Sequence, residues 1–483
     1  MLLSDDLLLD YKRCQRRAFL NVYGQRTERT VQREFLLKLQ RENRKQIAEI
    51  LTGQSYCQPH FGSRDWETGA NQTWQLMKQG VELIYKGVLL LPSVSPSIPT
   101  YLGRPTLLKK QSGSSDLGSW HYLPINVKLG KRPKPEYKTI AAFHAYILAR
   151  IQGLLPTTSR IVVRSRREYD VDLNNWLPRL AEILSQCYAT LSNPVEPELF
   201  ISRQRCSLCQ WHSSCYAIAS SQRHLSLVPG ITPSRYQSLR ECGVTSLTQL
   251  ATVSASQIES ERIDADLTQQ LQQQARSLLA DKPLPKPQFY SLGTLPTASV
   301  ELYFDIEAEP ERNLDYLLGV LLVDRQAKTE QFYPFLAETP EEEGLIWEQF
   351  LTLTERYSDA PIFHFSDYEI ETVKRLGSQY QTPSNRLNSV LSRLVDLHEW
   401  TMESATMPVE SYSLKSLAGW LGFQWRDRGA SGEATVCWYD RWLVSGDRTL
   451  LEAIVRYNED DCRATYRLKQ WLEQFLLNAP QRI

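Results

Sequence analysis

The run SVELYFDIEAE at residues 299–309 places the strongest constraint on how the last third of this chain can fold. Its apolar and aromatic residues predict a β-strand. Residues two apart on a strand point to the same side, so Asp305 and Glu307 are expected to share one face. Two carboxylates held this close repel each other unless a cation neutralises them. For this pair taken alone, a solvated strand face is the alternative interpretation.

The residues that follow this run predict a mixture of strands and helices. Further strands are expected at 316–324, 329–336 and 360–365, and helices at 341–357, 411–421 and 450–476. Strands followed by helices in this order are typical of an α/β domain.

Further acidic residues occur at two places in this region. Tyr457 and Asp461 are four residues apart on the last predicted helix, so both face the same way. A packed aromatic side chain is the alternative interpretation of Tyr457. Earlier, residues 362–376 read as a strand that runs into a helix, with Asp367 and Glu369 at the junction. Asp396 follows in the run LVDLHEW.

This ordered set resembles the DEDD exonucleases of the RNase H-like fold, in the variant whose third motif is YxxxD. That family has DxE on its first strand, an FD pair that opens a helix, and YxxxD on a late helix. The matching positions here are Asp305 and Glu307, then Tyr368 and Glu369, then Tyr457 and Asp461.

The second motif departs from the family pattern. Glu369 stands where the family has Asp, and Asp367 is the alternative ligand. Asp396 matches an acidic position that related domains carry after the second motif. A longer side chain can displace a metal ion, so a nucleic-acid-binding protein with decayed nuclease sites is the alternative function.

The resemblance implies a metal-dependent 3′–5′ exonuclease that hydrolyses DNA or RNA. Two Mg²⁺ or Mn²⁺ ions about 4 Å apart would activate a water molecule and stabilise the leaving oxygen. Such hard cations prefer carboxylate oxygens. Tyr457 would orient the attacking water. The implied catalytic and metal-binding carboxylates are those of Asp305, Glu307, Glu369 and Asp461.

A cysteine cluster lies far from these carboxylates, in the run CSLCQWHSSC. With the early Cys14, the residues Cys206, Cys209 and Cys215 resemble the RecB-like nucleases that carry an iron–sulfur cluster. The resemblance implies a [4Fe–4S] cluster held by these four thiolates. The alternative is a Zn²⁺ site in which His212 joins the three late cysteines.

The rest of the RecB-like pattern is present with its catalytic positions altered. That family has G-x-x-D, then D/E-x-K, then Q-x-x-x-Y. Here Thr106 replaces the first acid, and Asn126 replaces the carboxylate two residues before Lys128. His144 lies where the third motif is expected, without a convincing Gln. Because Thr and Asn cannot supply anionic charge for Mg²⁺, the hydrolytic site of this region is expected to be inactive. A front-half site that uses Lys128 and an unidentified acid is the rival hypothesis.

The middle of the chain predicts a small helical region. The run LVPGITPSRYQSLRECG resembles a helix-hairpin-helix element, in which Gly230 permits a tight turn and helix amides meet a phosphate oxygen. A plain helical spacer is the alternative. The run PLPKPQ predicts a stiff, proline-rich linker.

Charge is distributed unevenly although the net charge is zero. Residues 1–300 carry 37 basic and 24 acidic side chains, and residues 301–483 carry 18 and 31. The basic surplus predicts a polyanionic partner, here single-stranded DNA or RNA. Basic residues near the altered RecB-like motifs are expected to hold its backbone: Lys109, Lys110, Lys128, Lys131, Arg132 and Lys134.

The expected fold class is a multi-domain α/β protein. Residues 1–222 would form a degenerate PD-(D/E)XK-like α/β domain, 223–290 a small helix-hairpin-helix-like domain with a linker, and 291–483 an RNase H-like α/β domain. No membrane span is expected, because no run approaches about 20 apolar residues. Asp5, Asp6 and Asp10 interrupt the apolar start, which is unlike a signal peptide, so a cytoplasmic location is predicted.

Overall fold

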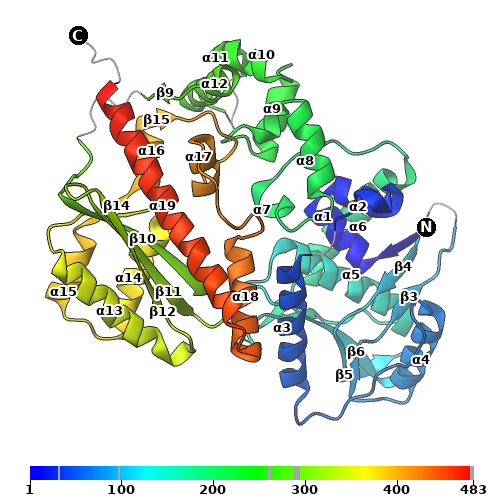
Figure 1. Cartoon of the computed structure of the whole chain (residues 1–483). Coiled ribbons are helices and arrows are strands. Elements are labelled where there is room, and N and C mark those ends of the chain that lie inside the picture. Colours follow the sequence, from blue (N-terminus) through cyan, green and yellow to red (C-terminus); the bar gives the residue numbers. More distant parts are fainter. Residues whose placement is uncertain (31–32, 96–97, 165, 259–262, 287–293, 479–483) are drawn as a thin grey trace. The chain divides into compact units, whose positions relative to one another are not determined.

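The computed structural model describes residues 1–30, 33–95, 98–164, 166–258, 263–286 and 294–478 (Figure 1). The chain divides into two compact units, Met1–Ile218 and Ala219–Ile483. The mixed α/β fold class expected from the sequence is confirmed.

The first unit contains a five-stranded sheet with the strand order β2-β5-β6-β7-β8. Strands β5 and β6 form an antiparallel hairpin, and β6 pairs with β7 in parallel. A separate three-stranded sheet has the order β1-β4-β3. The strands are β1 (Leu2–Ser4), β2 (Leu83–Tyr85), β3 (Leu89–Leu91), β4 (Thr100–Gly103), β5 (Leu107–Ser115), β6 (Gly118–Val127), β7 (Ser159–Val162) and β8 (Glu168–Val171).

Helices pack against both faces of the larger sheet. From one side, α5 (Pro135–Gln152) buries Phe143 in a cluster with Tyr122 of β6. From the other, α3 (Glu34–Leu51) buries Ile47 beside Ile125. The remaining helices of this unit are α1 (Asp5–Arg13), α2 (Gln15–Tyr23), α4 (Trp66–Lys78), α6 (Leu173–Ser192), α7 (Arg203–Cys206) and α8 (His212–Ser221), which continues into the second unit.

A proline separates β4 from β5. Strand β5 begins only at Leu107, two residues after Pro105. Pro105 has no N–H to donate to a sheet, which interrupts the strand before that point. Gly103 instead ends β4 in the smaller sheet. Helix α5 begins at Pro135 and ends before Gly153, whose φ of 71° closes it.

The second unit begins with the predicted helical region. Part of the expected linker forms regular structure, because Leu284–Pro285 form strand β9, which pairs with β15 (Ala405–Thr406). Residues 287 and 288 of the expected linker lie outside the described residues. The helices are α9 (Pro233–Glu241), α10 (Leu247–Thr252), α11 (Ala255–Ile258) and α12 (Ala265–Ala280).

A five-stranded sheet forms the centre of the second unit, with the order β12-β11-β10-β13-β14. Strands β10, β11 and β12 are antiparallel neighbours, whereas β10, β13 and β14 run in parallel. The strands are β10 (Val300–Glu309), β11 (Leu314–Asp324), β12 (Thr329–Leu336), β13 (Ile362–His364) and β14 (Leu394–Asp396).

The two faces of strand β10 pack against different helices. Leu302 and Phe304 pack in a cluster with Phe350 of α13 (Glu343–Arg356). On the opposite face, Tyr303 packs with Leu468 of α19 (Arg448–Asn478), the long helix that crosses the sheet in Figure 1. Because the side chains of a strand alternate, Asp305 and Glu307 share the α19 face with Tyr303.

The sequence also predicted the segments around this sheet, with some omissions. Helices α13, α17 and α19 lie where helices were expected. The short helices α15 and α16 and the helix α18 were not predicted. The helices not yet given are α14 (Asp367–Gln379), α15 (Ser384–Leu391), α16 (Leu397–Ser404), α17 (Leu414–Trp420) and α18 (Gly432–Ser445).

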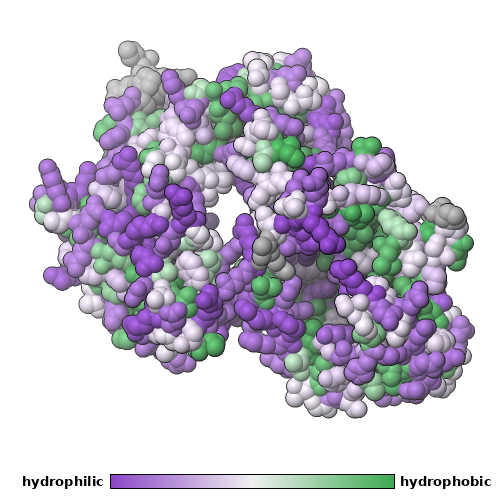
Figure 2. Space-filling model, turned by 45° about the vertical axis from the view of Figure 1, so that its right-hand side comes forward, coloured by the Kyte–Doolittle hydropathy of each residue, from purple (hydrophilic) through white to green (hydrophobic). Residues whose placement is uncertain are grey.

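On the face drawn in Figure 2, hydrophilic side chains predominate and hydrophobic ones lie in smaller areas between them. Within the described part of the chain, no helix is both long enough and apolar enough to cross a bilayer.

A buried charge network fixes α14 to the sheet. Arg375 of α14 forms ion pairs with Asp315 of β11 and with Glu343, whose Oε1 lies 3.0 Å from the guanidinium. Both carboxylates are almost fully buried. Breaking a buried pair leaves an uncompensated charge, which is far more costly than losing a surface pair.

We therefore expect Arg375→Met to lower the free energy of unfolding at neutral pH by about 3 kcal/mol. The loss should shrink as the pH falls, because Asp315, whose pKa is raised by burial, can then take up a proton in the folded state. Urea unfolding at pH 8 and pH 5 measures this. Arg386→Met is the matched control, since its partners Glu348 and Glu355 are exposed and the expected cost is under about 1 kcal/mol. Equal losses in the two variants would contradict the expectation.

Candidate active site

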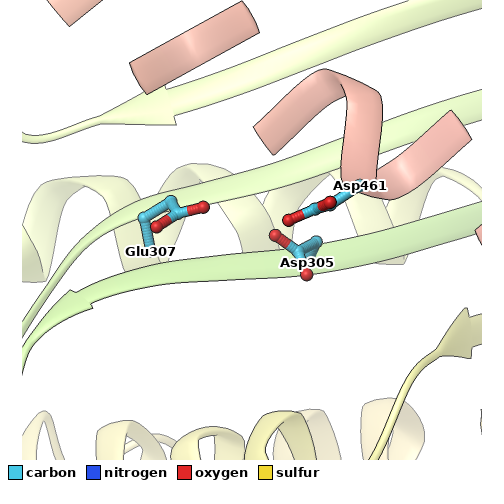
Figure 3. A group of neighbouring side chains, drawn as sticks. All are labelled: Asp305, Glu307 and Asp461. Atoms are coloured by element: carbon cyan, nitrogen blue, oxygen red, sulfur yellow. The ribbon is translucent and has the colours of Figure 1, made fainter. Parts of the chain in front are cut away.

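Strand β10 and helix α19 bring three carboxylates together. Asp305 and Glu307 project from the same side of β10, and Asp461 projects toward them from α19 (Figure 3). One oxygen from each lies within 4.8 Å of the others, and Glu307 and Asp461 are buried. Within the described ranges, this is the one such group of three metal-ligating side chains.

Each of the three carboxylates accepts a hydrogen bond from a different element. Asn458 of α19 donates its Nδ2 hydrogen to Asp305 at 2.7 Å. Thr435 of α18 donates to Glu307 at 2.7 Å. The Nε1 of Trp425 donates to Asp461, also at 2.7 Å. None of these three donors was predicted from the sequence.

A glycine makes room for the Asn458 side chain. Gly319 of β11 pairs with Asp305 in the sheet register. A Cβ placed on Gly319 would lie 1.6 Å from Oδ1 of Asn458, far inside any possible contact. The helix can therefore approach the sheet at this point only over a residue without a side chain.

Burial and mutual repulsion make the three carboxylates hard to ionise. Burial, followed by the nearby charge of Asp461, raises the pKa of Glu307 to about 8. Burial raises the pKa of Asp461 to about 6, against the opposing effect of the Trp425 hydrogen bond. The pKa of Asp305 is raised well above its usual value, first by burial and then by Asp461, Glu307 and Glu369. Removing the protons from this group requires positive charge nearby.

Tyr457 lies one helical turn before Asp461 and is buried with it. Burial is the main cause that raises the pKa of its hydroxyl, and the charges of Asp461, Glu307 and Asp305 add to this. The phenol therefore stays protonated and can act as a hydrogen-bond donor or acceptor beside the carboxylates.

The second-motif residues separate into a buried and an exposed set. Glu369 is buried, and its charge is close enough to raise the pKa of Asp305. Asp367, the first residue of α14, is exposed. Tyr368 is also exposed, and it donates its hydroxyl hydrogen to Asp315 at 2.9 Å. Of the two acidic alternatives, Glu369 is the one that lies near the carboxylate group, although it is not among the three within 4.8 Å.

Two further residues shape the junction between β13 and α14. Asp396 accepts hydrogen bonds through Oδ1 from the backbone N–H of Ser366 and of His398, so it caps local turns. His364 is fully buried, and its Nδ1 lies 3.6 Å from Oε2 of Glu369. Within the described residues, that Glu369 oxygen receives no hydrogen bond.

This set of groups fits a divalent cation. The carboxylates are close together and have raised pKa values, and one buried oxygen of Glu369 receives no hydrogen bond within the described residues. A hard cation that prefers oxygen ligands would neutralise these carboxylates and bind that oxygen. Mg²⁺ and Mn²⁺ take such ligands. Asp305, Glu307 and Asp461 could hold one ion, and Glu369 could contribute to a second.

The four cysteines expected to act together line one cavity of the first unit, with His212 also in its wall. Burial raises the pKa of Cys206 to about 11, whereas Arg16 partly opposes the effect of burial on Cys215. Within the described residues, no three of these ligand atoms lie within 4.8 Å of one another. Zn–S bonds of 2.3 Å would bring tetrahedral thiolates to about 3.8 Å from each other, so this spacing is wider than zinc requires.

Two residues of the motifs expected from the RecB-like resemblance, His144 and Lys128, lie near Asp5, which was not predicted as a site residue. Asp5 of α1 lies 3.0 Å from Nε2 of His144 and also pairs with Arg104. Its charge is also a neighbour of Lys128. Burial alone would raise the pKa of Asp5, but the hydrogen bonds and electrostatic effects of His144 and Arg104 together hold it well below its usual value. Asn126 is buried on the strand that leads to Lys128.

Comparison with known families supports the assignment of the second unit. Residues 302–473 match the family model of the RNase_H superfamily, which confirms the expected RNase H-like domain. The matched range includes all five residues proposed for the active site. No curated protein matched the chain. The RNase H-like domain indicates a nuclease-type enzyme that acts on nucleic acid.

The raised pKa values of Asp305, Glu307 and Asp461 predict how the stability of the metal-free protein changes with pH. A carboxylate whose pKa is higher in the folded than in the unfolded state costs stability as the pH rises through that interval. We expect the wild type in EDTA to lose stability between pH 5 and pH 8. Asp305→Asn should be more stable than the wild type at pH 8, by about 1 kcal/mol or more, with a smaller difference at pH 5. Thermal melts measure this.

Exposed Asp367 provides the matched control. Asp367→Asn should show no pH-dependent gain. In Mn²⁺ without EDTA, the wild type should melt at a higher temperature, whereas Asp305→Asn should not respond. An Asp305→Asn variant less stable than the wild type in EDTA at pH 8 would show that repulsion does not dominate this site.

Proposed function

We propose that the second unit is a metal-dependent exonuclease that hydrolyses phosphodiester bonds of DNA or RNA in the 3′–5′ direction. The observation that carries this proposal is the group of three carboxylates from β10 and α19, within a region that matches the RNase_H superfamily. Asp305, Glu307, Glu369 and Asp461 are the proposed metal ligands. Bound Mg²⁺ or Mn²⁺ would supply charge neutralisation at the scissile phosphate.

The protein groups around the metal ligands have distinct tasks in this mechanism. Asn458, Thr435 and Trp425 hold the carboxylates in place through one hydrogen bond each. The protonated Tyr457 hydroxyl would accept a hydrogen bond from the attacking water and orient it. Burial of the site excludes bulk water, which strengthens each electrostatic interaction there.

A cleavage assay with 5′-labelled single-stranded DNA and RNA tests this proposal. With Mn²⁺ or Mg²⁺ we expect a ladder of shortened labelled products, and none with EDTA. Asp305→Asn and Glu369→Gln should each lower the rate by more than about 100-fold, because metal ligands matter more than their supporting residues. Asp367→Asn should cleave at the wild-type rate. Circular single-stranded DNA should resist cleavage.

Other outcomes would contradict the proposal. Immediate release of labelled mononucleotide would reverse the polarity, and cleavage of the circle would make the enzyme an endonuclease. If Lys128→Ala or Asp5→Ala loses cleavage while Asp305→Asn remains active, the catalytic site lies in the first unit.

A second candidate function is nucleic-acid binding without catalysis. The position of Glu369 outside the group of three within 4.8 Å favours it. Wild type and Asp305→Asn would then be equally inert with every metal, while both bind the strand with the same affinity.

We further propose that the first unit is a RecB-like domain that holds or guides a single strand in the cytoplasm. The basic surplus of residues 1–300 supports the polyanionic partner. The shared cavity of Cys14, Cys206, Cys209 and Cys215, with a spacing wider than zinc requires, supports a [4Fe–4S] cluster that joins the two ends of this unit.

Protein purified without air should therefore be brown, with a broad visible absorbance band and about four iron atoms per chain. Cys206→Ser should lose the colour and the iron, whereas Cys57→Ser, a change at an exposed thiol outside the cavity, should keep both. A colourless protein that contains one zinc per chain would overturn the cluster assignment and favour the site with His212.

A further inference from the structure

A single lysine lies beside the carboxylate group and has no task in the mechanism above. Lys415 is the second residue of α17 and is exposed, in contrast to the buried carboxylates. Its Nζ lies 4.8 Å from the ring centroid of Tyr457 and 5.6 Å from that of Trp425. Both rings belong to residues of the site, and Trp425 itself donates to Asp461.

The ammonium of Lys415 is also an electrostatic neighbour of the carboxylates. Its charge favours the ionised forms of both Glu307 and Asp461. Nζ donates one hydrogen bond, to the carbonyl oxygen of Ala430 at 2.6 Å. Within the described residues this is its one hydrogen bond, and an ammonium has three donors. Two donors therefore remain for a ligand that arrives from solvent.

Charge balance indicates what that ligand is. Four carboxylates and two divalent cations sum to zero. A phosphodiester adds one negative charge, and attack by hydroxide adds a second in the transition state. The excess lies on the non-bridging phosphate oxygens, and a preorganised cation at this position would stabilise it.

We propose that Lys415 is a catalytic residue that binds a non-bridging oxygen of the scissile phosphate. This inference rests on the proposed nuclease function and adds a phosphate-binding group to it. Lys415 is not a metal ligand, because a cation cannot donate electron pairs to another cation. Its removal should therefore affect phosphate chemistry and metal binding in opposite directions.

The test compares Lys415→Met, which keeps the length of the side chain over the two rings, with Lys415→Arg, which keeps the charge. At saturating Mn²⁺, Lys415→Met should lower the single-turnover cleavage rate by about 100-fold or more. Lys415→Arg should restore the rate to within about tenfold of the wild type. Lys374→Met, a change on the exposed face of α14, is the control and should leave the rate unchanged.

Mn²⁺ binding without nucleic acid provides the second readout. Calorimetric titration should show that Lys415→Met binds Mn²⁺ as tightly as the wild type or more tightly, because a repelling positive charge is gone. A cooperative melting transition should accompany this result and show that the variant is folded.

Three results would overturn the inference. A wild-type cleavage rate in Lys415→Met would show that Lys415 does not contact the reacting phosphate. If Asp305→Asn is inactive in the same assay, the proposed nuclease function stands even though the inference about Lys415 fails. Weaker Mn²⁺ binding by Lys415→Met would show that the lysine acts only by supporting the site. Failure of the wild type itself to cleave would overturn the proposed function and this inference together.

Discussion

Repulsion among Asp305, Glu307 and Asp461 is the constraint around which the second unit is arranged. Three carboxylates within 4.8 Å in a buried setting oppose folding, so the surrounding elements must hold them against that force. The ten-residue strand β10 and the 31-residue helix α19 provide rigid supports, and large hydrophobic clusters on both faces of the sheet stabilise them. The stability cost at the site is therefore offset by packing elsewhere.

The hydrogen bonds to these carboxylates show how the fold controls orientation without adding positive charge. Asn458, Thr435 and Trp425 are neutral donors from two helices and the connection between α17 and α18. Neutral donors fix each carboxylate and leave its negative charge available for cations. Arg375 has the opposite arrangement, since its guanidinium forms ion pairs with both Asp315 and Glu343 in a structural network. The same domain thus carries acidic groups of two kinds, those paired with a cationic side chain of the protein and those left for a ligand.

The sequence predicted the parts of the site that lie on regular elements. Asp305 and Glu307 follow the two-residue period of a strand, and Tyr457 and Asp461 follow the spacing of a helix, so local geometry alone relates each pair. The two pairs come together only because α19 packs on β10. This packing was expected from the resemblance to a known fold and not from the local sequence pattern. Asn458 could have been noticed because it follows Tyr457 directly. Thr435, Trp425 and Lys415 come from segments with no recognisable pattern, and only tertiary structure brings them to the site. Asp5 was missed for the same reason, since its partners Arg104 and His144 are about 100 and 140 residues away.

The contact between Gly319 and Asn458 has a consequence for how this protein can evolve. The carboxamide of Asn458 occupies the space that a side chain at Gly319 would need, and the same carboxamide holds Asp305. Neither position can change alone: a larger residue in the strand would expel the amide, and a smaller residue in the helix would leave a void and an unsupported carboxylate. Across homologous sequences, the two positions should therefore covary as a pair, with glycine retained wherever the asparagine is retained.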